Sequence, residues 1–197
     1  MARVSRPASP DKRWLQNRSE RLLRSAGIAR GQVVLDFGCG EGTYTLPAAR
    51  VVGAEGRVYA ADKDRKKLAV VARTAKRDAL RNVAPVHVTG GRRIPLRSGS
   101  VDRVLLYDVL HRGYFPEEQQ RTDLLRCVRR VLRPEGLLSC YLTHLNKYGM
   151  TFKRQLCELR SAGFSLRGEQ RKTLLHDGTL TRGRIFSFAR AGKRRNR

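Results

Sequence analysis

Three glycines spaced two residues apart follow an acid near the end of an apolar run, in the stretch VLDFGCGEGT at 34–43. Gly38, Gly40 and Gly42 allow the backbone to turn tightly and to approach a ligand closely. A dinucleotide site is typified by G-x-G-x-x-G, whereas the spacing here is G-x-G-x-G with Thr43 next. A carboxylate at the end of the strand, Asp36, repels phosphates and suits a cationic group. The pattern therefore argues against a pyrophosphate ligand.

A second acid ends a second apolar stretch, RVYAAD at 57–62. Asp62 is placed to accept both hydrogen bonds from a ribose diol. A ribose beside a cationic, amino-acid-like group describes an adenosyl amino acid. The sequence thus predicts such a ligand at the glycine loop.

These residues need a scaffold that brings strand ends together. Short apolar, β-branched runs alternate with segments of helical periodicity, which is typical of parallel βαβ units. We predict a doubly wound α/β sheet in which the ligand binds beyond the carboxyl ends of the strands. Strands are predicted over 32–38, 57–62, 83–89, 101–108 and 137–142, followed by a last hairpin from 164–170 and 184–190. Helices are predicted over 11–27, 44–52, 65–80, 116–133 and 151–163, and the segment 133–136 is predicted to end the helix before it.

The length and composition of the chain limit its domain organisation and its cellular location. The chain has 197 residues and 40% hydrophobic content, enough for one core, and we predict a single domain over 1–190 with a basic tail over 191–197. No apolar run is long enough to span a membrane, and the four cysteines are far apart, as expected of reduced thiols. We expect a cytoplasmic protein without a metal site. An organellar transit segment at the arginine- and serine-rich start is the alternative.

The chain resembles the class I S-adenosylmethionine-dependent methyltransferases, in particular ubiquinone/menaquinone C-methyltransferases and arsenite methyltransferases. The resemblance covers roughly residues 12–190. It rests on four motifs in the family's order: VLDFGCGEGTYTLPAA, GRVYAADKD, IPLRSGSVDRVLLYDVLH and VLRPEGLL. It implies a Rossmann-like, mostly parallel seven-stranded sheet with an antiparallel C-terminal edge strand.

The resemblance also implies a set of site residues. Asp36 would orient the amino group of the methionine moiety, and Asp62 would bind the ribose. Gly90 stands where the family commonly has an acid that binds the adenine amino group, so we expect weaker binding of the cofactor, with the backbone of Gly91 or Arg92 meeting the edge of the adenine ring. The cofactor set as a whole is Asp36, Gly38, Cys39, Gly40, Gly42, Asp62, Lys63, Gly90, Gly91, Arg92 and Tyr107.

The segment YDVLHRGY after the fourth strand lies, in that family, over the transferable methyl group. Asp108 and His111 are candidates for a catalytic base, and Tyr107 and Tyr114 for the wall of an acceptor pocket. The alternative is structural: Asp108 would cap a turn, and His111 would pack against the cofactor loop.

The acceptor stays open between a small molecule and RNA. No Asp-Pro-Pro-Tyr, Asn-Pro-Pro-Tyr or Pro-Cys motif follows the fourth strand, which argues against methylation of base amines or of pyrimidine C5. The net charge of +25 favours a polyanion partner, and one predicted basic helix face carries Arg126, Arg129, Arg130 and Arg133. A rival hypothesis is a non-catalytic protein that binds S-adenosylmethionine or RNA on the same fold.

Overall fold

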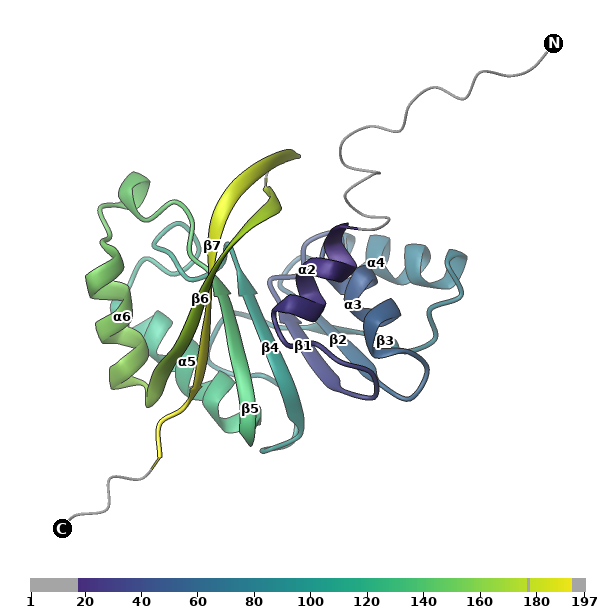
Figure 1. The fold of residues 1–197 in the computed structure, drawn as a ribbon, viewed down its shortest axis with the longest axis horizontal. Helices are drawn as coiled ribbons and strands as arrows, with labels where there is room; N and C mark the ends of the chain where they lie inside the picture. Colours follow the sequence, from purple (N-terminus) through teal and green to yellow (C-terminus); the bar gives the residue numbers. More distant parts are fainter. Residues whose placement is uncertain (1–17, 177, 193–197) are drawn as a thin grey trace.

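The computed structural model describes residues 18–176 and 178–192 (Figure 1). The first part of the predicted N-terminal helix and most of the predicted basic tail lie outside the described residues. Within them, the chain folds into one seven-stranded sheet of order β3-β2-β1-β4-β5-β7-β6. The strands are β1 Val33–Phe37, β2 Arg57–Asp62, β3 Val83–His87, β4 Val101–Tyr107, β5 Leu132–Tyr141, β6 Phe164–His176 and β7 Thr179–Arg190.

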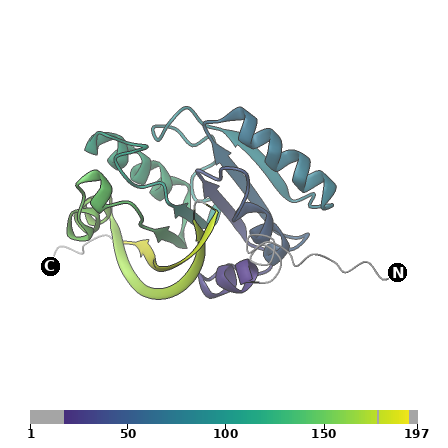
Figure 2. The ribbon, with the colours of Figure 1, turned by 90° about the horizontal axis from the view of Figure 1, so that it is seen from above.

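The direction of the strands confirms the predicted architecture. Every pairing among the strands β1 to β5 is parallel, whereas β7 pairs antiparallel with β5 and with β6. The last hairpin therefore forms the edge of the sheet, with β7 inside and β6 outermost. Both hairpin strands run longer than predicted and form a curved arm, visible from above in Figure 2.

Helices cover both faces of the sheet (Figures 1 and 2). Alternate residues of one strand point to opposite faces, and β4 shows this directly. Leu105 packs in a core with residues of α2 and α3, whereas Val104 and Leu106 pack with residues of α5 and α6. The helices are α2 Ser19–Ser25, α3 Thr45–Val52, α4 Arg65–Arg77, α5 Glu118–Val131 and α6 Phe152–Ser161, with the short 3-10 helix η2 Asn146–Tyr148 before α6.

The predicted end of the helix over 116–133 needs a correction. Helix α5 ends at Val131, and the segment 133–136 belongs to β5, which begins at Leu132. A register shift between Val101 and Arg103 of β4 accommodates this irregular start, which contains Pro134. Consequently Arg133 lies on a strand and not on the helix.

A buried ion pair joins α5 to α6 on one face of the sheet. The Arg121 guanidinium donates to both carboxylate oxygens of Glu158, at 2.9 and 2.8 Å. Its remaining nitrogen donates to the carbonyl oxygens of Phe115 and Pro116. Arg121 therefore anchors the loop that follows β4.

No helix in the described part of the chain is long and apolar enough to cross a membrane.

Candidate active site

A pocket of about 790 Å³ opens at the carboxyl ends of β1, β2 and β4, where the sequence places the ligand. It is lined by residues from the glycine loop, the end of β2, the segment 88–92 and the loop 107–115. This volume lies within the range of about 300 to 1,000 Å³ that is usual for small-molecule sites. The pocket therefore brings most of the predicted site residues together.

The glycine loop wraps around the end of β2. The backbone N–H groups of Gly38 and Cys39 both donate to the carbonyl oxygen of Ala61, at 2.7 and 3.1 Å. Gly38 has φ +76°, and a Cβ there would lie 2.5 Å from Val109 Cγ2, so only glycine fits. Gly40 has φ +55° with open space where a Cβ would be, on the pocket side. The loop thus provides a surface of bare backbone.

Asp62 is held at the pocket wall by two backbone donors. Its Oδ2 accepts from Gly40 N–H and its Oδ1 from Asp64 N–H, both at 2.9 Å. Each carboxylate oxygen keeps further capacity to accept a hydrogen bond. The side chain is only 9% exposed, and it is among the residues that line the pocket. This geometry presents two fixed acceptors to a diol.

Asp36 lies deeper than the pocket wall. It is 3% exposed, and its Oδ2 accepts a hydrogen bond of 2.6 Å from the Thr45 hydroxyl. Burial raises the pKa of this carboxyl from 3.8 to about 6, and the nearby Asp62 charge adds to the rise. Cys39 and Gly42 are likewise absent from the lining, since both pack behind the loop toward α4. These three predicted residues therefore lie behind the pocket wall.

The segment after β3 closes another side of the pocket. Gly90, Gly91 and Arg92 line it, as does Lys63 from the end of β2. Gly90 has φ +109°, and a Cβ there would have no atom within 4 Å, whereas a Cβ on Gly91 would lie 2.8 Å from Leu124 Cβ. The Arg92 side chain is turned outward, with Nε 3.8 Å from Asp123. Arg92 therefore borders the pocket near the end of a segment whose path depends on glycine.

The fourth side of the pocket comes from the loop after β4. Tyr107, Asp108 and Tyr114 line it, and the Lys63 ammonium lies 5.6 Å from the centre of the Tyr114 ring. The Tyr107 hydroxyl is buried at 2.9 Å from Ser139 Oγ, and burial raises its pKa. Tyr114, by contrast, is 49% exposed. Tyr107 thus forms a fixed wall and Tyr114 the rim.

His111 stands behind Asp108 and not on the pocket wall. Its Nδ1 accepts from the Gly113 N–H at 3.1 Å, and its Nε2 lies 3.7 Å from Asp108 Oδ1. Only 3% of the residue is exposed, and burial lowers its pKa to about 4. The two candidate catalytic residues are therefore adjacent, and of the two only Asp108 lines the pocket.

Two further histidines that sequence reasoning missed reach the same carboxylate. His144 Nε2 lies 3.8 Å from Asp108 Oδ1, and His176 Nδ1 lies 3.4 Å from Asp108 Oδ2. A signal existed for His144, because it follows β5 as Asp108 follows β4, and adjacent parallel strands end at the same edge. His176 ends β6, far along the curved hairpin, and no local pattern marks it.

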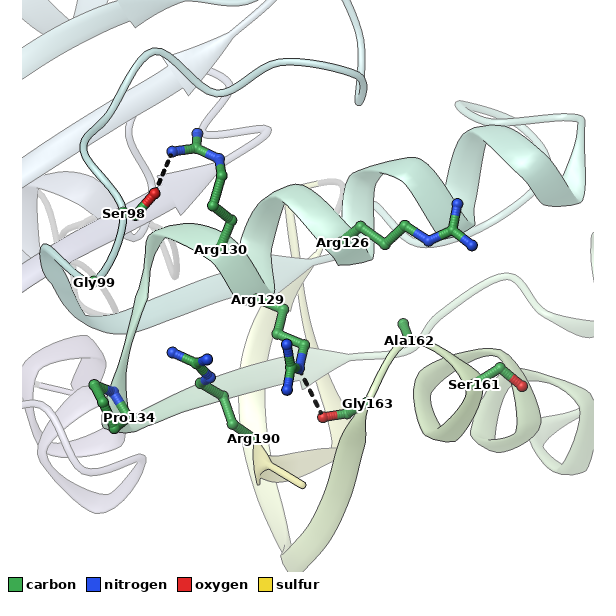
Figure 3. Close-up of a pocket in the computed structure, with 10 residues that line it drawn as sticks. All are labelled: Ser98, Gly99, Arg126, Arg129, Arg130, Pro134, Ser161, Ala162, Gly163 and Arg190. Atoms are coloured by element: carbon green, nitrogen blue, oxygen red, sulfur yellow. Dashed lines mark hydrogen bonds between the residues drawn. The ribbon is translucent and has the colours of Figure 1, made fainter. Parts of the chain in front are cut away.

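The predicted basic face is divided in the structure. Arg130 donates to the carbonyl oxygens of Ile94 and Leu96, and Arg133, on β5, forms an ion pair of 2.6 Å with Asp102. Arg126 and Arg129 do lie together with Arg130, and Arg190 of β7 joins them around a second pocket of about 740 Å³ (Figure 3). The arginines of this positive cleft thus come from α5 and β7, and Arg133 lies outside it.

The sequence of this chain is similar to those of known methyltransferases. Residues 34–136 match a family model described as a methyltransferase domain. Demethylmenaquinone methyltransferase of Geobacillus stearothermophilus is 29% identical over 122 residues, covering 62% of this chain and 50% of the relative. A probable cobalt-precorrin-6B C(15)-methyltransferase of Saccharolobus solfataricus is 42% identical over 60 residues, 30% of each chain. The chain thus spans half or less of the length of these relatives.

The fold has a close counterpart among solved structures. A SAM-dependent methyltransferase from Aquifex aeolicus superposes with a TM-score of 0.73 at 20% identity, covering 92% of this chain and 94% of the other. At that level of sequence identity, the structural similarity supports a shared fold and nothing further. The family match covers more than half of the chain and includes the glycine loop, Asp62 and Asp108. The chain therefore belongs to the methyltransferase-domain family, on the fold of S-adenosylmethionine-dependent methyltransferases.

Proposed function

We propose that this protein transfers a methyl group from S-adenosylmethionine to an acceptor bound at the Asp108 end of the pocket. The observation that carries the proposal is the fixed Asp62 carboxylate beside the exposed backbone of Gly40, in a pocket large enough for a nucleoside. Two fixed acceptors fit a ribose diol, and a surface without side chains fits a closely approaching ligand.

The residues on the glycine-loop side would hold the methyl donor. Asp62 would bind the ribose, Gly38 and Gly40 would pass along the methionine moiety, and the backbone of Gly91 or Arg92 would meet the adenine edge. Asp36 would act from behind the wall, where a bound ammonium group would favour its ionised form. Cys39 and Gly42 would shape the loop and make no ligand contact of their own. When bound, S-adenosylmethionine supplies an electrophilic methyl group on a sulfonium.

The residues on the acceptor side would position the nucleophile and exclude water. We propose that Asp108 accepts a hydrogen bond or a proton from the acceptor, because it is the acidic residue that lines this end of the pocket. His111 would position Asp108: its Nδ1 already accepts from Gly113, so in the neutral ring the proton sits on Nε2, toward Asp108. Tyr107 and Tyr114 would form the wall and rim of the acceptor pocket.

A small-molecule acceptor fits the described pocket best. The matched relatives include demethylmenaquinone methyltransferases, which favours a small acceptor here as well. RNA is the second candidate, supported by the cleft of Arg126, Arg129, Arg130 and Arg190.

The four cysteines, all free, agree with the proposed cytoplasmic location.

Labelled methyl transfer tests the proposal. The full chain is incubated with methyl-labelled S-adenosylmethionine and a cell extract, and label is followed into the small-molecule, RNA and protein fractions. We expect label in the small-molecule fraction, lost in Asp108→Asn. Label in RNA that is lost on replacing Arg126, Arg129 and Arg190 with glutamine would identify the second candidate. Binding of the donor without transfer to any fraction would support the non-catalytic alternative.

A further inference from the structure

Three of the four histidines of the chain surround one carboxylate, although they lie far apart in the sequence. Asp108 follows β4, His144 follows β5, and His176 ends β6. The two ring nitrogens of His144 and His176 that face each other are 2.9 Å apart, and each ring has a nitrogen within 3.8 Å of Asp108. Two facing imidazole nitrogens at this distance cannot both carry hydrogen, so at least one lone pair points into the cluster.

The spacing of these donor atoms suits a metal ion. One donor atom from each of Asp108, His144 and His176 lies within 4.8 Å of the others. Zinc binds imidazole nitrogen at about 2.0 to 2.1 Å and carboxylate oxygen at about 2.0 to 2.2 Å, so donors on a tetrahedral shell stand roughly 3.4 Å apart. The separations in the structure, 2.9 Å between the two histidines and 3.4 and 3.8 Å from their rings to Asp108 oxygens, lie around that value. Imidazole ligands favour transition metals such as Zn²⁺ over Mg²⁺ or Ca²⁺.

The backbone at two of these residues is held in an unusual conformation. Asp108 has φ 57° and His144 has φ 55°, and among the residues that the structure describes only Ala79 is another non-glycine residue with positive φ. The N–H of Asp108 donates to the carbonyl oxygen of Tyr141 at 3.0 Å, which fixes the first of these turns to β5. Conformations of this kind cluster at functional sites because the surrounding structure must hold them in place.

His111 provides outer support to the same carboxylate. Its Nε2 lies 3.7 Å from Asp108 Oδ1, and its ring stacks on Tyr148 with centroids 4.9 Å apart. A ring locked in this way orients the oxygen that it faces. Metal-ligating side chains are commonly oriented by such outer partners.

We propose that Asp108, His144 and His176 bind a divalent transition-metal ion, with Zn²⁺ as the representative ion. Three protein ligands leave one position open, which is the arrangement of catalytic zinc sites. Asp108 also lines the main pocket, whereas His144 and His176 do not, so the proposed metal site adjoins the pocket at its Asp108 end. An oxygen of the acceptor, such as a hydroxyl, would complete the coordination, and its proton would pass to the Asp108 oxygen that does not bind the metal. The sequence predicted no metal site, so this proposal departs from that prediction.

Metal binding can be measured without the methyl donor or an acceptor. The full chain, stripped with a chelator, is titrated with ZnCl₂ by calorimetry, and Co²⁺ absorption in the visible range reports the coordination geometry. We expect one ion per chain and a tetrahedral Co²⁺ spectrum. His144→Ala and His176→Ala should weaken binding by more than about 100-fold, because changes to outer partners alone cost about 10- to 100-fold. The outer variant His111→Ala should fall within that smaller range.

The fourth histidine provides the matched control. His87 lies at the end of β3, with Nε2 3.2 Å from the Lys63 carbonyl oxygen, and His87→Ala should bind Zn²⁺ like the unaltered protein. His144→Gln and His176→Gln serve if an alanine variant fails to fold. Absence of saturable Zn²⁺ binding by the unaltered chain overturns the proposal, as does equal binding by the folded cluster variants. Zn²⁺ binding with no methyl transfer would leave the metal site standing and remove the proposed function instead.

Discussion

The two sides of the main pocket are built in opposite ways. The glycine-loop side comes from two neighbouring β-α connections, and its key carboxylate, Asp62, is fixed by backbone N–H groups within 22 residues of it. The side proposed for the acceptor brings together side chains from three separate parts of the chain, held by side-chain contacts: Asp108, His111, His144 and His176. Local backbone geometry defines the first side, and tertiary packing defines the second. Changes that disturb packing should therefore damage the acceptor side first.

The largest expected effect is on the anchor of the acceptor side. Arg121→Met leaves Glu158 charged and buried, and we expect the free energy of unfolding to fall by about 3 to 5 kcal/mol. The double variant Arg121→Met/Glu158→Leu should recover most of that loss, since no unpaired charge remains. Chemical denaturation measures both.

An exposed ion pair is the control for that variant. Arg24 and Glu20 are 3.2 Å apart on the surface of α2, and Arg24→Gln should change the unfolding free energy by less than about 1 kcal/mol. A similarly small effect for Arg121→Met would mean that the loop after β4 does not depend on its anchor.

The next effect separates the two sides functionally. Asp108→Asn should lower turnover by about 100-fold or more while leaving the affinity for S-adenosylmethionine nearly unchanged, because its contribution arises with the acceptor. Calorimetry and labelled transfer measure the two quantities on one preparation. Equal losses of affinity and turnover would place Asp108 on the donor side of the pocket.

This contrast also explains what the sequence can predict. The apolar run that ends at Asp62 and the glycine spacing at Gly38 and Gly40 are continuous in the sequence, so a local motif predicts them. His176 meets Asp108 only because the curved β6–β7 hairpin carries the end of β6 to the residue that follows β4, and no local spacing encodes that curvature. Arg121 shows a related limit: it is buried on the same helix face as Leu124, and its partner Glu158 lies 37 residues further along the chain, where no local pattern indicates the pairing. The predicted helical position of Arg133 is wrong because α5 passes directly into β5.

Asp36 makes the glycine-loop side sensitive to pH. A folded-state pKa that is raised from 3.8 to about 6 means that the fold favours the protonated form, so this group's contribution is present at low pH and is lost as pH rises through about 6. Asp36→Asn should therefore stabilise the ligand-free protein by about 2 to 3 kcal/mol at pH 8, at about 1.36 kcal/mol per pKa unit. The gain should shrink as pH falls below 6 in denaturation experiments. A gain that is equal at pH 5 and pH 8 would contradict the assigned ionisation.

Asp62 tests the donor side directly. Asp62→Ala should weaken S-adenosylmethionine binding by about 1.5 to 3 kcal/mol, the range for hydrogen bonds to a charged group. Asp64→Ala is a useful comparison: Asp64 caps α4 through the Lys66 and Lys67 N–H groups, so its loss should affect stability more than affinity. Unchanged affinity of Asp62→Ala by calorimetry would remove the ribose contact from the proposal.

The smallest expected effect concerns Gly90, where the family commonly has an acid. Its φ of +109° strains any side chain, although a Cβ would meet no atom within 4 Å. Gly90→Asp alone would combine that strain with a new hydrogen bond to the adenine amino group, so Gly90→Ala must be measured beside it. If the adenine edge lies at this segment, the aspartate variant should bind S-adenosylmethionine more tightly than the alanine variant by about 0.5 to 1.5 kcal/mol, the net value of one hydrogen bond. Equal affinities of the two variants would mean that the adenine amino group lies elsewhere, and that the glycine-loop side recognises its ligand through the ribose and the methionine moiety alone.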